Sequence, residues 1–314
     1  MLRRLRGRVL ALALLSLVPP AAAAEPVALT FDDLPTLSLT DAPDYARTTT
    51  ARLVKRLRRH RIPAIGFVVG DKLEGDPTAS RAMLETWLNA GFELGNHTYS
   101  HPSLNHAPAT DYLADIQRDD DLLRPLLAAH GASPRWFRHP YLETGATLAD
   151  MWTVQSWLAL RGYRIAPVTL EASDYMFALP YDEAILRGDK PAARAVKAAY
   201  LDYTAKSVAW YRGAALQLLG RRPALVFLLH ASRLNADSVD ELAAILRHNH
   251  LRPVSLETAM RDPAYALPDD HADPDGDEWL TRWSQTLGRP LPWSTFAEPP
   301  ADIAAANDRL DTAP

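Results

Sequence analysis

Short apolar runs alternate with longer segments of helical composition along this chain, and no other feature constrains its fold as strongly. The apolar runs, each of strand length, cover residues 27–31, 65–69, 92–95, 136–137, 163–169, 224–229 and 253–256. The helical segments cover residues 41–60, 78–90, 111–130, 148–160, 182–219 and 237–248. Alternating strands and helices form mainly parallel sheets, open or closed into a barrel. We therefore predict an α/β fold.

Individual residues mark the expected ends of several helices. Asp41 is placed to cap the first helix, while Gly91 and Gly131 are typical of the residue that follows a helix end. Pro125 is expected to kink or split the third helix, because proline lacks the N–H that the helix needs. The long Ala-rich stretch at residues 182–219 is predicted to be an insertion of one or two helices.

The first 24 residues have the pattern of a secretory signal peptide. Four arginines precede a largely apolar run of ten residues, Val9 to Val18, and Ala22, Ala23 and Ala24 supply the small-residue cleavage site. The apolar run is too short to cross a bilayer as a stable helix. We expect a periplasmic or secreted protein with no stable membrane insertion after cleavage; a retained N-terminal anchor is the alternative.

Composition narrows the classes of partner and ligand. Removing residues 1–24 leaves 290 residues, with 30 basic against 38 acidic side chains, a formal net charge of −8. Such an acidic protein is unsuited to sequence-independent nucleic-acid binding, which needs clustered positive charge. The chain contains no cysteine, so its core must stabilise it without disulfides, and any metal must bind nitrogen and oxygen ligands.

Beyond residue 268 the composition shifts toward Asp, Pro, Trp and Gly. We predict a C-terminal extension over residues 268–314 that packs on the domain through Trp279, Trp283 and Trp293 and ends in a disordered terminus. The acidic cluster at 269–277 lacks the ligand spacing of a calcium loop and is expected to be solvated surface. Four other tryptophans are predicted core residues, since large aromatics dominate buried area: Trp136, Trp152, Trp157 and Trp210.

Reactive side chains follow several predicted strands, where parallel sheets bind ligands. Asp32 and Asp33 end the first strand; adjacent carboxylates there are costly unless paired or metal-bound, although they can instead cap the next helix or face solvent. His97 and His101 follow the third strand. Their i, i+4 spacing places both on one face of a helical turn, from which both can reach one metal; ordinary surface histidines are the alternative.

Two later strands end in further candidates. Arg138 can pair with a pocket carboxylate and lower its pKa, and His139 is either a third imidazole ligand or an ordinary strand-end histidine. His230 ends the apolar run at 224–229, where Glu171 or Asp174 can hold its tautomer and keep it protonated.

Together these groups supply what metal-assisted hydrolysis requires. Two imidazoles and one carboxylate hold a divalent cation and leave positions open for water and a carbonyl oxygen. A second carboxylate can remove the proton of the water, and a protonated histidine can return one to the leaving group. The residues thus predict hydrolysis of an amide or ester.

Five segments, in order, resemble the motifs of the polysaccharide deacetylases with a NodB-type domain, carbohydrate esterase family 4. The first, Thr-Phe-Asp-Asp-Gly-Pro in the family, occurs at residues 30–35 with Leu34 in place of glycine. The motifs His-Ser/Thr-x-x-His, Arg-x-Pro-Tyr and Leu-x-His match residues 97–101, 138–141 and 228–230. The fourth, Asp-x-x-Asp-Trp, is only approximated at 171–175, where Glu171 and Tyr175 depart from it.

The resemblance implies a division of roles among these residues. Asp33, His97 and His101 are the expected ligands of one divalent ion, most often Zn²⁺, with Co²⁺, Ni²⁺ or Mn²⁺ as alternatives. Asp32 is the expected general base, held by Arg138.

The remaining roles concern the substrate and the leaving group. The backbone N–H of Tyr141 is expected to bind the oxyanion, and Asp174 to tune His230 as the general acid. Tyr175 and Leu228 are expected to line the pocket for the acetyl methyl group.

The family fold is a distorted, incomplete (β/α) barrel, expected here over residues 25–267 with a helical insertion at about 176–222. The implied activity removes N-acetyl groups from N-acetylglucosamine-type glycans, namely chitin oligomers, peptidoglycan or exopolysaccharide. Leu34, expected to place a bulky side chain near the site, and the insertion motivate an alternative, hydrolysis of another amide, imide or O-acetyl ester. A non-catalytic glycan-binding protein is a further alternative.

Overall fold

The computed structural model describes residues 24–311, so residues 1–23 and 312–314 lie outside the described part of the chain. The predicted signal peptide at 1–24 therefore falls almost entirely outside the described residues. Among residues 24–311 there is no helix that combines the length and the apolar character needed to cross a membrane.

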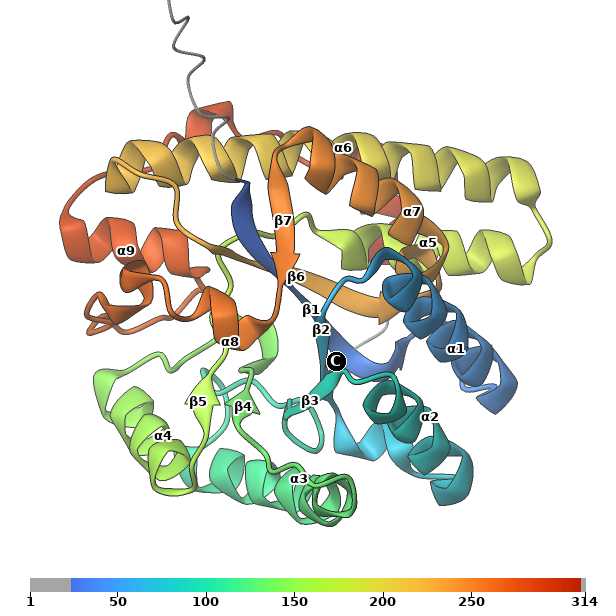
Figure 1. The fold of residues 1–314 in the computed structure, drawn as a ribbon, viewed down its shortest axis with the longest axis horizontal. Coiled ribbons are helices and arrows are strands. Elements are labelled where there is room, and N and C mark those ends of the chain that lie inside the picture. The colour runs from blue at the N-terminus through green and yellow to red at the C-terminus, as the bar shows by residue number, and fades with distance from the viewer. Residues whose placement is uncertain (1–23, 312–314) are drawn as a thin grey trace, which may run out of the picture.

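A seven-stranded sheet of parallel strands forms the centre of the described residues (Figure 1). Its order is β5-β4-β3-β2-β1-β6, and β7 pairs with β1. The strands are β1 (Glu25–Leu37), β2 (Ala64–Val68), β3 (Glu93–Asn96), β4 (Trp136–Phe137), β5 (Arg164–Ile165), β6 (Leu225–Ser232) and β7 (Leu251–Val254). The prediction of a curled α/β sheet of the incomplete barrel type is confirmed.

The two edges of the sheet approach each other beyond β5. Leu170 forms an isolated parallel bridge with Phe227 of β6, and the Leu228 N–H donates to the Leu170 carbonyl at 2.9 Å. The strand predicted at 163–169 is therefore only partly formed, because β5 ends at Ile165. Pro167 explains this shortening, since it has no N–H to donate to a neighbouring strand.

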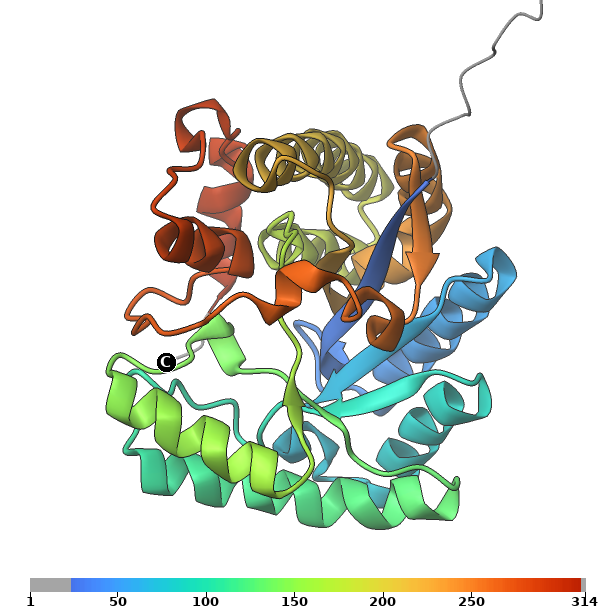
Figure 2. The same ribbon diagram turned by 60° about the vertical axis from the view of Figure 1, so that its left-hand side comes forward.

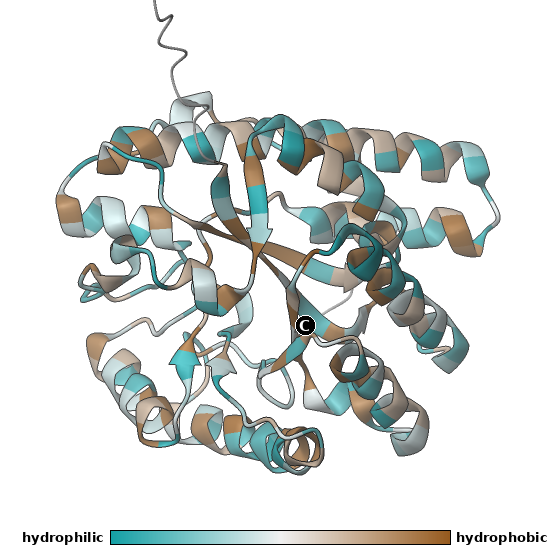
Figure 3. Cartoon of the chain, in the orientation of Figure 1, coloured by the Kyte–Doolittle hydropathy of each residue, from teal (hydrophilic) through white to brown (hydrophobic). Residues whose placement is uncertain are grey.

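Helices surround the sheet (Figures 1 and 2). Figure 3 shows hydrophobic residues along much of β6, whereas β5 and β7 also carry hydrophilic ones. The surrounding helices include α1 (Pro43–His60), α2 (Pro77–Asn89), α3 (Ala109–Ala129), α4 (Leu148–Leu160), α7 (Arg233–His248) and α8 (Leu256–Ala259). Short 3-10 helices occur at η1 (Gly70–Leu73), η2 (Pro140–Leu142), η3 (Pro263–Ala266) and η4 (Trp293–Thr295). Leu29 and Phe31 of β1 share the main core with Leu53 and Leu57 of α1, which explains the apolar spacing of that helix.

One helix-end prediction needs correction. Asp41 does not cap α1; Ala42 precedes the helix without a side-chain hydrogen bond, and Pro43 begins it. Proline suits this position because its fixed φ is helical and the missing N–H is not needed there. Pro125 lies inside α3 and does not split it, so a kink there stays a prediction.

The predicted helical insertion consists of two helices, α5 (Asp174–Leu186) and α6 (Lys190–Leu219). Asp189 separates them, and its side chain accepts a hydrogen bond from the Ala192 N–H at 3.0 Å, which caps α6. Helix α5 begins at Asp174, so the fourth motif leads directly into the first turn of this insertion.

The C-terminal extension contains α9 (Trp279–Leu287) and α10 (Ala301–Leu310). The expected disordered terminus is not tested, because residues 312–314 lie outside the described residues. Trp279 and Trp283 are buried, and Trp293 stacks on Trp210 with ring centroids 4.6 Å apart.

Two burial predictions also fail. Trp152 is 48% exposed and is not a core residue; it lies on the outer face of α4, whereas Met151 and Val154 point inward. The acidic cluster at 269–277 is not simply solvated surface, because Asp273 is buried and pairs with Arg282 at 3.0 Å.

Candidate active site

Asp33, from the second half of β1, lies together with His97 and His101, which follow the carboxyl end of β3. Oδ1 of Asp33 lies 3.8 Å from Nε2 of His97 and 3.6 Å from Nε2 of His101. This oxygen is buried and accepts no hydrogen bond among the described residues. A buried carboxylate oxygen that faces two imidazole nitrogens without a donor has the chemistry of a divalent-cation site.

The two histidines do not lie on a helical turn, so that part of the prediction is wrong. The chain after β3 instead turns through left-handed backbone at Thr98 and His101, with φ of 67° and 56°. Asp115 of α3 holds this loop, because its carboxylate accepts the N–H groups of Tyr99 and Ser100 at 2.7 and 2.9 Å. Left-handed non-glycine residues are costly and persist only where surrounding contacts determine them, as at functional sites.

The protonation states of this cluster favour cation binding. Nδ1 of His97 donates to the Arg138 carbonyl at 2.8 Å, which directs Nε2 toward Asp33. Burial lowers the pKa of His97 and of His101, which keeps both imidazoles neutral. Burial opposes ionisation of Asp33, but nearby positive charge, led by the Lys72 ammonium at 3.1 Å, outweighs it and lowers the pKa of Asp33 well below the usual range. Neutral imidazoles and an ionised carboxylate are the ligand forms that bind metal.

Asp32, the neighbour of Asp33, lies beside the cluster and has a different partner. Its Oδ2 accepts Nη1 of the buried Arg138 at 3.2 Å. Arg138 is itself held by the Ala166 carbonyl at 2.8 Å and by Thr30 Oγ1 at 3.1 Å. Burial raises the pKa of Asp32 to about 6, although the Arg138 charge opposes this rise. A carboxyl group with such a pKa is suited to accept a proton near neutral pH.

His230 of β6 and Asp174, the first residue of α5, form a second carboxylate–imidazole pair. Nδ1 of His230 donates to Asp174 Oδ1 at 2.8 Å, and the His230 backbone N–H donates to Oδ2 at 2.7 Å. Burial tends to lower the pKa of His230, but the charge and hydrogen bond of Asp174 outweigh it and raise this pKa to about 9. Of the two predicted partners, Asp174 and not Glu171 therefore makes the hydrogen bond. The imidazole is a proton donor at neutral pH.

Two partly exposed tyrosines lie beside the histidines of the site. Tyr141 is 54% exposed, and its ring centroid lies 4.6 Å from that of His101. Tyr175 is 42% exposed, and its ring centroid lies 5.9 Å from that of His230. Leu228 is buried in a small apolar cluster with Leu142, the residue after Tyr141, and Val168. The substrate-binding roles of Tyr141, Tyr175 and Leu228 stay predictions.

Two residues that the sequence singled out lie elsewhere. His139 is not with the cluster; it shares a hydrogen bond with the Tyr112 hydroxyl at 3.0 Å, and burial lowers its pKa to about 3. Leu34 does not enter the site, because its side chain is fully buried and occupies the space over Gly66 in β2. The expectation that this bulky side chain enters near the site is therefore wrong.

Lys72 and Asn235 belong to the site although the motifs do not include them. Lys72 lies on η1, just after β2, and the rule that ligands bind beyond strand ends points to it. Asn235 of α7 donates from its amide to Asp174 Oδ2 and to the His230 carbonyl. No pattern in the sequence singles out Asn235, because its role depends on how α7 packs against β6.

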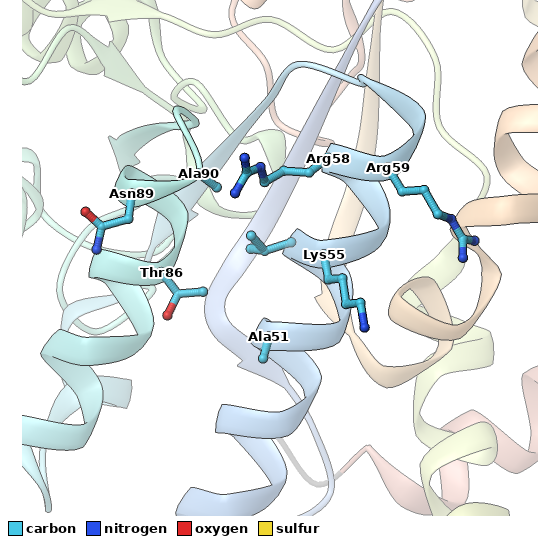
Figure 4. A pocket seen from close by; sticks show the side chains of 8 residues that line it. Ala51, Lys55, Arg58, Arg59, Thr86, Asn89 and Ala90 are labelled. Atoms are coloured by element: carbon cyan, nitrogen blue, oxygen red, sulfur yellow. The ribbon is translucent and has the colours of Figure 1, made fainter.

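A surface hollow between α1 and α2 lies apart from these residues (Figure 4). It is lined by Lys55, Arg58 and Asn89, among others, in the last turns of the two helices. Those turns adjoin the amino ends of β2 and β3, whereas the site lies at the carboxyl ends of the strands. None of the candidate site residues lines the hollow.

Comparison with known proteins supports the resemblance seen in the sequence motifs. Residues 21–160 match the sequence profile of the polysaccharide deacetylases. The chain is 32% identical over 117 residues to a peptidoglycan-N-acetylglucosamine deacetylase of Bacillus cereus, a match covering 37% of this chain and 36% of the relative. It is 29% identical over 150 residues to a chitin deacetylase of Colletotrichum lindemuthianum, covering 48% and 52%. The chain thus matches about a third to a half of the length of these relatives.

Solved structures agree with this assignment at the level of the fold. A polysaccharide deacetylase from Bacillus cereus superposes with a TM-score of 0.50 at 18% identity, covering 74% of this chain and 91% of that one. The profile match and the relatives confirm the resemblance to the polysaccharide deacetylases with a NodB-type domain, and the profile match covers residues 21–160 of this chain.

Proposed function

We propose that this protein is a metal-dependent hydrolase that removes N-acetyl groups from N-acetylglucosamine-type glycans. The observation that carries the proposal is one site that combines the cation-binding groups of Asp33, His97 and His101 with a carboxyl base and a protonated histidine. The two curated relatives, a peptidoglycan-N-acetylglucosamine deacetylase and a chitin deacetylase, support this class of substrate.

The cation ligands in this proposal are Asp33 Oδ1 and the Nε2 atoms of His97 and His101. Nitrogen and oxygen donors of this kind suit Zn²⁺ best and also accept Co²⁺, Ni²⁺ or Mn²⁺. When bound, the cation polarises the acetyl carbonyl and makes the attacking water more acidic.

Asp32 removes the proton from the attacking water. Arg138 holds Asp32 Oδ2 at 3.2 Å, so Oδ1, which has no other partner among the described residues, is the oxygen that receives the proton. The backbone N–H of Tyr141 donates to the carbonyl oxygen as negative charge develops on it.

His230 completes the reaction by giving its Nε2 proton to the leaving amine nitrogen. Asp174 holds Nδ1 at 2.8 Å and stabilises the charged imidazole before the transfer. Tyr175 and Leu228 provide apolar surface for the acetyl methyl group.

We place this activity outside the cytoplasm, in the periplasm or medium. The signal-peptide pattern at residues 1–24 supports this location, as does the substrate named for the Bacillus cereus relative. The partner is then an acetylated carbohydrate.

Acetate release tests the proposal directly. Purified protein, with its metal content measured, is incubated with chitin oligomers, peptidoglycan, poly-N-acetylglucosamine and acetylated xylan. We expect acetate from the N-acetylglucosamine substrates, loss of activity on chelation and recovery with Zn²⁺. Release from xylan alone supports an O-acetyl esterase, and binding without turnover supports a non-catalytic glycan-binding protein. Full activity of metal-free protein would refute metal dependence.

A further inference from the structure

The loop that carries the proposed oxyanion donor has an unusual backbone. Tyr141 and Leu142 both have positive φ, 55° and 60°, although neither is glycine. Two consecutive residues in this region are unfavourable unless surrounding contacts hold them. The direction of the Tyr141 N–H depends on this conformation, so whatever holds the loop also aims the donor.

A distant segment of the chain packs directly against this loop. In Figure 2 the orange-red loop before α9 lies next to the green segment that follows β4. Gly276, with φ of 73°, approaches so closely that a Cβ atom there would overlap the Tyr141 carbonyl oxygen. The N–H and hydroxyl of Thr144 donate to Asp273 Oδ2, both at 3.4 Å, and the Asp273 N–H donates to the Gly145 carbonyl at 2.9 Å.

Arg282 of α9 fixes this segment from within. Its guanidinium pairs with Asp273 at 3.0 Å, and both side chains are buried. The same guanidinium donates to Asp269 Oδ1 at 2.7 Å and to the His271 carbonyl at 3.0 Å. Removing one member of such a buried pair leaves the other charge without its partner. The segment therefore has one strongly preferred arrangement.

We propose that residues 269–277, held by Arg282, are a positioning element of the active site. They fix the backbone of Tyr141 so that its N–H faces the reacting carbonyl oxygen. The inference rests on the proposed deacetylase function and extends it, because the family match ends at residue 160 and does not include this segment. The element does not touch the substrate; it acts through the Tyr141 loop.

Two glycine substitutions test the proposal, one with and one without contact to the loop. Gly276→Ala pushes against the Tyr141 carbonyl. Gly288→Ala is the matched control, because Gly288 also has positive φ, 61°, but nothing lies within 4 Å of an added Cβ. The assay measures kcat and KM for acetate release from chitin oligomers, together with Zn²⁺ affinity and melting temperature.

We expect Gly276→Ala to lower kcat by about tenfold to a hundredfold, the range for a misplaced or lost oxyanion donor. KM and Zn²⁺ affinity stay within about twofold of the wild type, and Gly288→Ala keeps its kcat. Equal kcat for the two variants overturns the positioning role and leaves the deacetylase proposal standing. A wild-type protein that releases no acetate overturns both.

A second pair of variants covers the case in which Gly276→Ala fails to fold. Asp273→Asn keeps the shape of the side chain but removes the charge that pairs with Arg282. Asp275→Asn is its control in the same loop, because Asp275 is exposed. We expect kcat to fall in Asp273→Asn only, with Zn²⁺ affinity unchanged in both; an unchanged kcat in Asp273→Asn contradicts the proposal.

Discussion

The Asp33–His97–His101 cluster and the Asp174–His230 pair use the same two residue types for opposite purposes. In the cluster the carboxylate oxygen and the imidazole nitrogens are 3.6 to 3.8 Å apart, and burial lowers the pKa of both histidines. In the pair the carboxylate and imidazole are in contact at 2.8 Å, and the pKa of His230 rises to about 9.

This difference indicates that the distance between carboxylate and imidazole, and not the residue type, determines whether the imidazole is protonated. A gap of more than about 3.5 Å is too long for a hydrogen bond, so the imidazoles stay neutral and their nitrogens remain available to a cation. Direct contact gives the imidazolium a charged hydrogen-bond acceptor, and it leaves no space for a cation between the carboxylate and the imidazole. In the proposed function, the cluster holds a cation and the pair holds a proton.

The largest expected loss of activity comes from replacing Asp32 while its neighbour Asp33 is kept. Asp32→Asn removes the proposed proton acceptor, and loss of a general base costs about 10²- to 10⁴-fold in kcat. The metal content should be unchanged, because Asp32 is outside the cation-binding group. Acetate release and metal analysis measure both quantities.

His101→Ala is the comparison variant for that experiment. It removes one nitrogen of the cation-binding group and is expected to lose both the metal and the activity. Loss of metal from Asp32→Asn as well would show that Asp32 is a ligand. The assignment of different roles to Asp32 and Asp33 would then be wrong.

A smaller effect, visible in the pH profile, is expected from Asp174→Asn. The acid form of His230 is required, and its pKa of about 9 means that the wild-type kcat falls as the pH rises through about 9. Without the Asp174 charge, nothing outweighs the effect of burial, which lowers the pKa of His230. The pH at which kcat falls therefore moves to a lower value. Near pH ~7.5 we expect a loss of roughly 10- to 100-fold.

Measurement of kcat between about pH 5 and pH 10 tests this prediction. The pH optimum of the variant should narrow and move to lower pH, because His230 loses its proton earlier while protonation of Asp32, with a pKa of about 6, still limits kcat on the acid side. An alkaline limit that stays at the wild-type position in Asp174→Asn would mean that another group provides the acid.

The smallest effect on activity is expected from Leu34→Ala, beside the catalytic carboxylates in sequence. Leu34 is fully buried against Gly66, so truncation leaves a cavity that glycine cannot fill. We expect the free energy of unfolding to fall by about 2–5 kcal/mol, with substrate preference unchanged. Urea unfolding and the substrate panel measure the two effects, and altered preference at unchanged stability would place Leu34 in the pocket after all.

The order of strands and helices was readable from the sequence because buried parallel strands need continuous apolar runs and the helices between them need an apolar stripe. The motifs were readable because most of them follow such a run directly. The wrong predictions concern positions where contacts or neighbouring residues override the conformation that the local sequence favours. Pro167 shortened one strand, and Asp115, far along the chain from His97, shaped the histidine loop that spacing alone assigned to a helical turn.

The primary structure therefore established the fold class, the family resemblance and the identity of most reactive groups, because these depend on residue type and periodicity along the chain. Tertiary packing alone decided that Leu34 faces the core, that Lys72 and Asn235 join the site, and that Asp273 is buried against the Tyr141 loop. It also decided which histidines are neutral and which is charged. Those outcomes depend on distances and burial between segments far apart in sequence, which no local pattern encodes.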